Sequence, residues 1–111
     1  RITTAQARAL VMASLNARQK RLASVALELL EAPSSKFLFF TATWAGIPGG
    51  SVVVENFVAD PYTGDVFIAA AKCDEVKNER LRALQKQIRA GLHLTQAEYR
   101  RLKTKGPLCQ Q

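Results

Sequence analysis

The stretch that decides the fold is Phe37-Leu38-Phe39-Phe40-Thr41-Ala42-Thr43-Trp44-Ala45. Aromatic and β-branched residues, which favour strands, fill most of its positions. Side chains alternate between the two faces of a strand. One face would carry Leu38, Phe40, Ala42 and Trp44, and the other Phe37, Phe39, Thr41 and Thr43. The stretch therefore predicts the clearest strand of the chain, around which the other elements can be placed.

Further strands are predicted on both sides of this one. Residues 52–59 and 66–70 are apolar runs joined by Asp60-Pro61-Tyr62-Thr63-Gly64-Asp65, a tight turn in which Pro61 presets φ and Gly64 can adopt the left-handed conformation. Residues 46–50, Gly-Ile-Pro-Gly-Gly, are expected to form a loop without helix or strand. Residues 22–31 fit a helix or a strand, and the Ala-Pro-Ser-Ser turn that follows favours a hairpin strand.

Helices are predicted at both ends of the chain. Thr3 or Thr4 can cap a first helix whose apolar stripe is Ala7, Leu10, Val11, Ser14 and Leu15, and the polar run at 16–21 would end it. Asp74 can cap a second helix that ends at Gly91. Its inner face would be Leu81, Leu84 and Ile88, and its outer face Glu75, Glu79, Arg82, Lys86 and Arg89. The capping box Thr95-Gln96-Ala97-Glu98 opens a last helix with Tyr99 and Leu102 turned inward.

The order of these elements predicts one α+β domain over residues 1–111. It would contain an N-terminal helix, a four-stranded antiparallel meander and two C-terminal helices, with the helices packed on one sheet face. Residues 2–70 would form the helix and sheet, and residues 73–109 a C-terminal helical module. The chain has 111 residues, of which 48% are hydrophobic, enough for a core without metals. No apolar run reaches the roughly 18 residues that a membrane span needs.

The two cysteines, Cys73 and Cys109, bracket the C-terminal module. An even pair in this position predicts a disulfide that clamps the two helices onto the rest of the domain. Disulfides persist in oxidising compartments, so the pair indicates a periplasmic or secreted protein.

Positive charge is concentrated in the second half of the chain. Residues 1–70 carry six Lys/Arg against five Asp/Glu, whereas residues 71–111 carry ten against four. Such a basic half suggests an acidic partner, which could be a protein, a nucleic acid or an anionic polymer of the cell envelope. A solvated helix surface would account for the same pattern.

Two segments resemble PepSY-like, cystatin-like small domains. The start Ile2-Thr3-Thr4-Ala5-Gln6-Ala7 is similar to their Thr/Ser-x-x-x-Ala helix opening, and residues 60–66 are similar to their Asp-x-x-Thr-Gly-Asp/Glu-Val hairpin. The resemblance spans residues 2–70 and leaves out the C-terminal helices. It implies an extracytoplasmic domain that binds or inhibits rather than catalyses. In size and setting the chain is also similar to periplasmic immunity and inhibitor proteins.

The sequence contains few residues of the types and spacings that catalysis needs. With one histidine, His93, and two widely spaced cysteines, a zinc site or a Cys–His nucleophile is not expected. A carboxylate hydrolase could pair Glu55 with Asp60 or Asp65, although Glu55 more simply points to solvent. The glycine-rich loop lacks the Lys-Ser/Thr of a phosphate loop. The sequence predicts no catalytic residue, no metal and no cofactor.

The sequence favours a protein-binding surface. Trp44 is a strong anchor type beside an adaptable loop, and a basic helix face would speed encounter with an acidic partner such as an enzyme or toxin. The expected contact residues are Trp44, Gly46, Ile47, Pro48, Gly49, Gly50, Ser51, Arg82, Lys86 and Arg89. The leading interpretation is a periplasmic or secreted inhibitor or immunity-type protein that acts by steric blockade. The alternatives are a nucleic-acid binder using the basic C-terminal helices and a carboxylate-based hydrolase.

Overall fold

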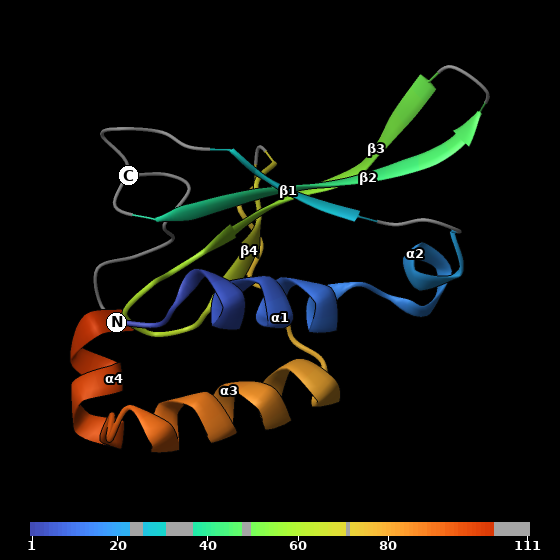
Figure 1. The fold of residues 1–111 in the computed structure, drawn as a ribbon. Coiled ribbons are helices and arrows are strands. Elements are labelled where there is room, and N and C mark those ends of the chain that lie inside the picture. Colours follow the sequence, from blue (N-terminus) through green and yellow to red (C-terminus); the bar gives the residue numbers. More distant parts are fainter. Residues whose placement is uncertain (23–25, 31–36, 48–49, 71, 104–111) are drawn as a thin grey trace.

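The described part of the chain forms one antiparallel sheet and four helices in the computed structural model (Figure 1). The structure describes residues 1–22, 26–30, 37–47, 50–70 and 72–103. Along the chain the elements are α1 (Thr4–Ser14), α2 (Ala17–Arg21), β1 (Ala26–Leu30), β2 (Leu38–Ile47), β3 (Gly50–Ala59), β4 (Val66–Ile68), α3 (Glu79–Gly91) and α4 (Gln96–Lys103). The predicted α+β class, the N-terminal helix, the four-stranded meander and the C-terminal helices are confirmed.

The strands follow one another in the sheet in the order β1-β2-β3-β4. Residues 26–30 form the predicted strand rather than a helix, with Leu29 opposite Phe40. The predicted strand faces of β2 are also found. Phe40 and Ala42 lie in the main core, while Phe37 and Phe39 pack against Val58 on the other face.

The expectation of a loop is wrong at residues 46, 47 and 50, while residues 48 and 49 lie outside the described ones. β2 continues to Ile47 and β3 begins at Gly50, with these two residues paired, so the hairpin is longer than predicted. The antiparallel ladder supplies the backbone partners that glycine-rich segments otherwise lack, which overrides their low strand propensity. An extra residue, Val54, lies between the partners of Ala42 and Thr43. Such a bulge bends the outer part of the β2–β3 hairpin, residues 43–47 and 50–53, hereafter the arm. Within the described residues, β2 beyond Thr43 pairs with β3 alone.

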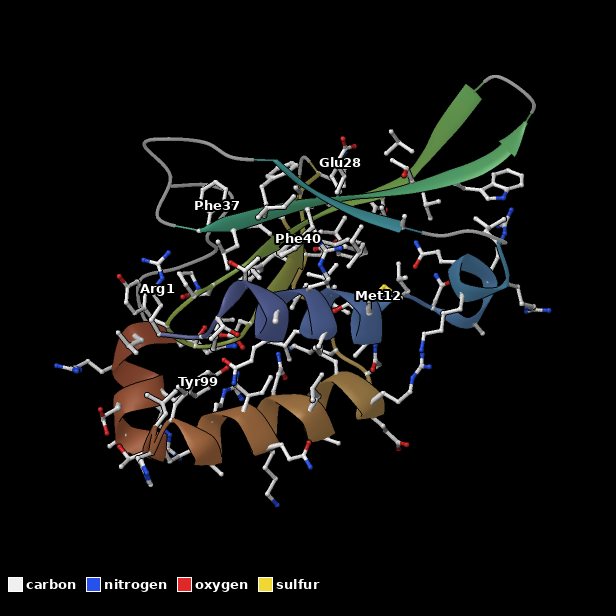
Figure 2. All side chains as sticks on the ribbon, in the orientation of Figure 1. Arg1, Met12, Glu28, Phe37, Phe40 and Tyr99 are labelled. Carbon is white, nitrogen blue, oxygen red and sulfur yellow. The ribbon has the colours of Figure 1, made fainter. Side chains whose placement is uncertain are left out.

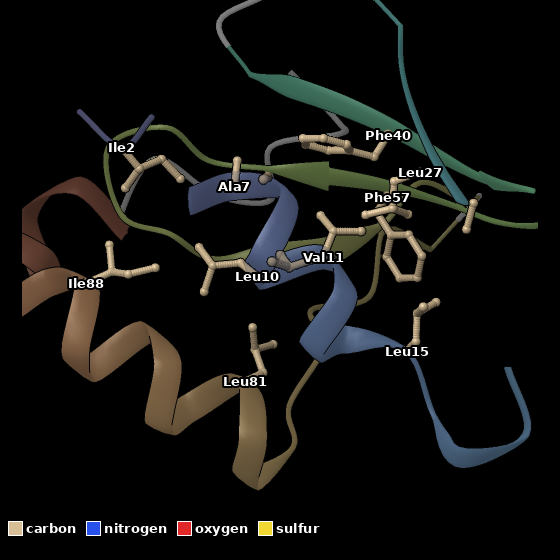
Figure 3. Packing of buried hydrophobic residues seen from close by; sticks show 13 residues of the cluster. Ile2, Ala7, Leu10, Val11, Leu15, Leu27, Phe40, Phe57, Leu81 and Ile88 are labelled. Atoms are coloured by element: carbon tan, nitrogen blue, oxygen red, sulfur yellow. The ribbon is translucent and has the colours of Figure 1, made fainter. Parts of the chain in front are cut away.

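The helices form two layers under one face of the sheet (Figure 1). α1 lies on the sheet, and α3 packs mainly against α1 rather than on the sheet as predicted. Figure 3 shows Leu81 and Ile88 of α3 reaching toward Leu10, while Phe40 and Phe57 cover α1 from the other side. α1 is therefore the middle layer, with the sheet packed against one side of it and α3 against the other.

Helix ends follow local capping chemistry. The Thr3 hydroxyl accepts from the Gln6 amide at 3.0 Å and the Gln6 side chain accepts from the Thr3 amide, a complete capping box. The polar run after α1 ends that helix as predicted, but Asn16 and Gln19 form a second capping box that starts the short helix α2. The residues of α2 carry no apolar stripe, so periodicity does not predict this helix.

The predicted cap of α3 at Asp74 is wrong, because Asn78 caps that helix. The Asn78 side chain accepts from the Leu81 amide at 2.8 Å and donates to the Ala13 carbonyl at 3.1 Å. Residues 74–76 instead extend along β4, where Glu75 bridges Phe67 and the Val76 amide donates to the Val66 carbonyl. β4 ends at Ile68, and the extended pairing of residues 74–76 delays the start of the helix by about one turn.

Cys73 precedes that extended segment and is buried, with 4% of its surface exposed and a positive φ of 49°. Its predicted partner, Cys109, lies outside the described residues, so the disulfide clamp stays a prediction. No helix in the described part of the chain is long and apolar enough to cross a membrane.

Candidate functional site

A buried carboxylate lies at the end of the turn between β3 and β4. The turn is held by the Asp60 side chain, which accepts from the amides of Tyr62 at 2.8 Å and Thr63 at 3.3 Å. Gly64 takes φ 78°, the left-handed conformation that the sequence predicted for it. The chain then enters β4 with the Asp65 side chain only 4% exposed, directed toward the C-terminal helices.

Both C-terminal helices donate to Asp65. The Arg89 guanidinium of α3 donates to its Oδ1 at 2.9 Å, and the Tyr99 hydroxyl of α4 donates to the same oxygen at 2.9 Å. Arg89 also donates through Nε to the Thr63 carbonyl at 2.7 Å and stacks over the Tyr99 ring at 4.1 Å. Figure 2 shows Tyr99 on the side of α4 that faces the domain. The β3–β4 turn is thus the anchor for α3 and α4.

Lys103 of α4 completes the cluster. Its ammonium donates to Glu75 at 2.8 Å and to the Tyr99 hydroxyl at 2.9 Å, and lies 3.7 Å from Asp65. Burial disfavours the charged form, but the hydrogen bonds to Glu75 and Tyr99 outweigh it and raise the pKa of Lys103. The pKa of Tyr99 is also raised, mainly because burial disfavours the phenolate. Both groups therefore hold their protons firmly at neutral pH.

A cavity of about 310 Å³ opens beside this cluster. Its charged lining residues are two carboxylates, Asp65 and Glu75, and four cations, Lys77, Arg82, Arg89 and Lys103. Arg89 and Lys103 pair with the two carboxylates. Lys77 and Arg82 are exposed and form no ion pair with any described residue. The cavity is therefore polar and carries surplus positive charge.

The predicted binding residues fall on two separate surfaces. Trp44 is half-buried in β2 opposite Val52, Gly46 and Ile47 continue β2, and Gly50 and Ser51 begin β3. Pro48 and Gly49 lie outside the described residues. Arg82 and Lys86 are exposed on α3, on the far side of the α1 layer from the β2–β3 arm (Figure 1). The arm and the basic face do not form one continuous patch.

Arg89 departs from its predicted place on the exposed face of α3. Leu81, Gln85 and Ile88 are buried, and position 89 lies one turn beyond Gln85 at the border of that stripe. Its long side chain can therefore reach inward to Asp65. Two features of the sequence could have predicted the cluster: the border position of Arg89 and the inward Tyr99. The local sequence gives no reason to assign Asp65 as their partner.

The other candidate catalytic groups are not assembled into a site among the described residues. Glu55 is half-buried and accepts from the adjacent Asn56 amide at 3.1 Å. Of the two carboxylates considered as its catalytic partners, Asp60 accepts from amides of the β3–β4 turn and Asp65 accepts from the C-terminal helices. His93 is exposed in the turn after α3, with φ 57°. No group of three metal-ligating side chains occurs in the described ranges.

Comparison with known proteins gives one informative match. No protein family matches the chain, so membership of the PepSY-like domains is not supported by such a match. No curated protein matches it either. The fold is similar to that of a chain in the solved structure of a type VI secretion system effector–immunity complex from Pseudomonas protegens. The TM-score is 0.65 at 20% sequence identity, over 87% of this chain and 82% of that chain. At this identity the match shows a shared fold.

Proposed function

We propose that this protein is an immunity-type binding protein that neutralises a toxic partner protein by covering part of its surface. The observation that carries the proposal is the fold shared, over 87% of the chain, with a component of an effector–immunity complex. The small size of the domain and its surplus of Lys/Arg, 16 against nine Asp/Glu, suit a protein that meets an acidic partner.

The chemistry of the buried cluster supports binding rather than catalysis. The Oδ1 atom of Asp65 accepts from both Arg89 and Tyr99, and its Oδ2 atom lies 3.7 Å from the Lys103 ammonium, so the carboxylate is held by structural partners. A general base needs a carboxylate that can reach a substrate proton. In this cluster the carboxylate instead fixes the positions of two helices.

We further propose that the protein works in the periplasm or outside the cell. The supporting features are the Cys73–Cys109 pair, one cysteine on each side of α3 and α4, and the resemblance of residues 2–70 to extracytoplasmic domains. A disulfide between Cys73 and Cys109 would hold α4 and α3, the helix that carries Arg82 and Lys86, against the rest of the chain.

Growth rescue tests the function directly. The chain is co-expressed in the periplasm with the product of a neighbouring toxin gene, and complex formation is followed by size-exclusion chromatography. We expect restored growth and a stable complex. Toxicity of this chain when expressed alone would contradict the proposal and favour an effector, the other partner type in such complexes.

The nucleic-acid alternative rests on exposed cations of the C-terminal helices, among them Arg82, Lys86, Arg100 and Arg101. It predicts affinity for any duplex or single strand that falls steeply with salt. Sub-micromolar, salt-dependent binding to a random oligonucleotide, without growth rescue, would favour it.

A further inference from the structure

We propose that the cavity between α3, α4 and the segment before α3 receives an acidic side chain, Asp or Glu, of the protein partner. This inference rests on the proposed function, because it names the part of the surface through which the partner is recognised. The interface would then be centred on the C-terminal helices rather than on the β2–β3 arm.

Charge is the first argument. Asp65 and Glu75 balance Arg89 and Lys103 within the wall of the cavity. Lys77 and Arg82 also line it and are not balanced by any described carboxylate. A carboxylate that entered the cavity would supply the missing negative charge and accept from these donors. Hydrogen bonds of this kind, between charged groups, are stronger than those between neutral groups.

The wall of the cavity is built before any ligand arrives. Gln85 is 6% exposed and donates to the Gly64 carbonyl at 2.9 Å, which ties α3 to the turn. The Tyr99 ring is fixed by Arg89 stacked at 4.1 Å and by its hydrogen bond to Asp65. These wall residues lose little conformational entropy on binding, so the ordering cost falls mainly on Lys77 and Arg82, the donors to the incoming carboxylate.

Size is the third argument. The cavity holds about 310 Å³, at the lower end of the range for small-molecule sites. A space of this size suits one or two side chains more than a cofactor. Its lining is polar apart from Val76 and the Tyr99 ring, so a carboxylate fits it better than an aliphatic anchor.

A peptide titration tests the cavity without the natural partner. Acetyl-(Glu)₄-amide and acetyl-(Gln)₄-amide are added separately to ¹⁵N-labelled protein. We expect the amides of Val76, Lys77 and Gln85 to shift with the glutamate peptide at millimolar concentration, and to stay unchanged with the glutamine peptide. Equal shifts with both peptides, or none with either, would overturn the proposal. Stronger shifts of the same amides with a dT₈ strand would overturn it in favour of nucleic acid.

Charge reversal then tests the cavity in the complex. The variant Lys77→Glu/Arg82→Glu changes two lining residues, and Lys86→Glu/Arg100→Glu makes the same change at exposed positions that do not line the cavity. We expect the first to weaken binding to the neutralised toxin by about tenfold or more and the second by less than about threefold. Equal effects of the two variants would refute the cavity while leaving the immunity function intact. Lack of rescue by the wild-type protein would refute the function, and the peptide titration would still decide whether the cavity binds carboxylates.

Discussion

Replacing Asp65 with asparagine tests whether the buried cluster holds the C-terminal helices. The substitution keeps the shape of the side chain but removes the charge that Arg89 and Tyr99 bond to, each at 2.9 Å. Hydrogen bonds to charged groups contribute about 1.5 to 3 kcal/mol each. The Arg89 side chain is 22% exposed, so water can partly replace the lost acceptor, and the asparagine oxygen keeps one bond. We expect the free energy of unfolding to fall by about 2 to 3 kcal/mol.

The assay is thermal and urea unfolding followed by circular dichroism. For a domain of this size the loss corresponds to a melting temperature lower by roughly 8 to 12 °C. Glu28→Gln, which removes an exposed carboxylate from β1, is the matched control and should change stability by less than about 0.5 kcal/mol. A double-mutant cycle with Arg89→Gln should show coupling between the two positions. A melting temperature for Asp65→Asn equal to that of the control, or no coupling in the cycle, would refute this account of the cluster.

Three further predictions concern the arm, the cysteines and the response to alkali. Trp44→Ala, in half-buried β2, should leave the affinity for the partner nearly unchanged because the proposed interface is centred on the C-terminal helices, as judged by calorimetry with melts to confirm folding; a loss of about 2 kcal/mol or more in a folded variant would make Trp44 an anchor and contradict that placement. Cys73 and Cys109 should resist alkylation without reductant in exported protein and add about 4 kcal/mol of stability, and two modified thiols on intact-mass analysis would disprove the pairing. Because the pKa values of Tyr99 and Lys103 are raised from 10.0 and 10.5 in the folded protein, their stabilisation is present below about pH 10 and is lost as pH rises. Between about pH 9 and pH 11, the free energy of unfolding in urea should therefore fall more for wild type than for a Tyr99→Phe/Lys103→Met variant. Equal falls would contradict the raised pKa values of Tyr99 and Lys103.

Periodicity predicted most of the fold because the strand and helix patterns are strong where side chains are buried. Residues 37–45 and the stripe of α1 each have a buried face, and both elements form where expected. The two main errors occur where backbone pairing decides the structure. Gly50 lies in a strand because it pairs with Ile47 of the neighbouring strand, and Asp74 lies beside β4 instead of at a helix cap.

The candidate site was predicted less well because its residues are distant in the chain. Asp65, Arg89 and Tyr99 come from a turn and two helices, and periodicity assigns a face to each residue but no partner. Helical periodicity predicts the basic face of α3 and the inward Tyr99. No local pattern places Asp65, an aspartate in a hairpin turn, against them.

The double role of Asp65 leads to a last prediction that separates stability from binding. Asp65 anchors the helices and is also one of two carboxylates that reduce the positive charge of the cavity. Asp65→Asn should therefore lower stability while it strengthens binding of the acetyl-(Glu)₄-amide peptide, because like charge near the incoming carboxylate is removed. The titration is done well below the melting temperature of the variant, with Glu28→Gln as control. Weaker peptide binding by a folded Asp65→Asn protein would mean that the cluster serves the cavity through its geometry and not through its charge.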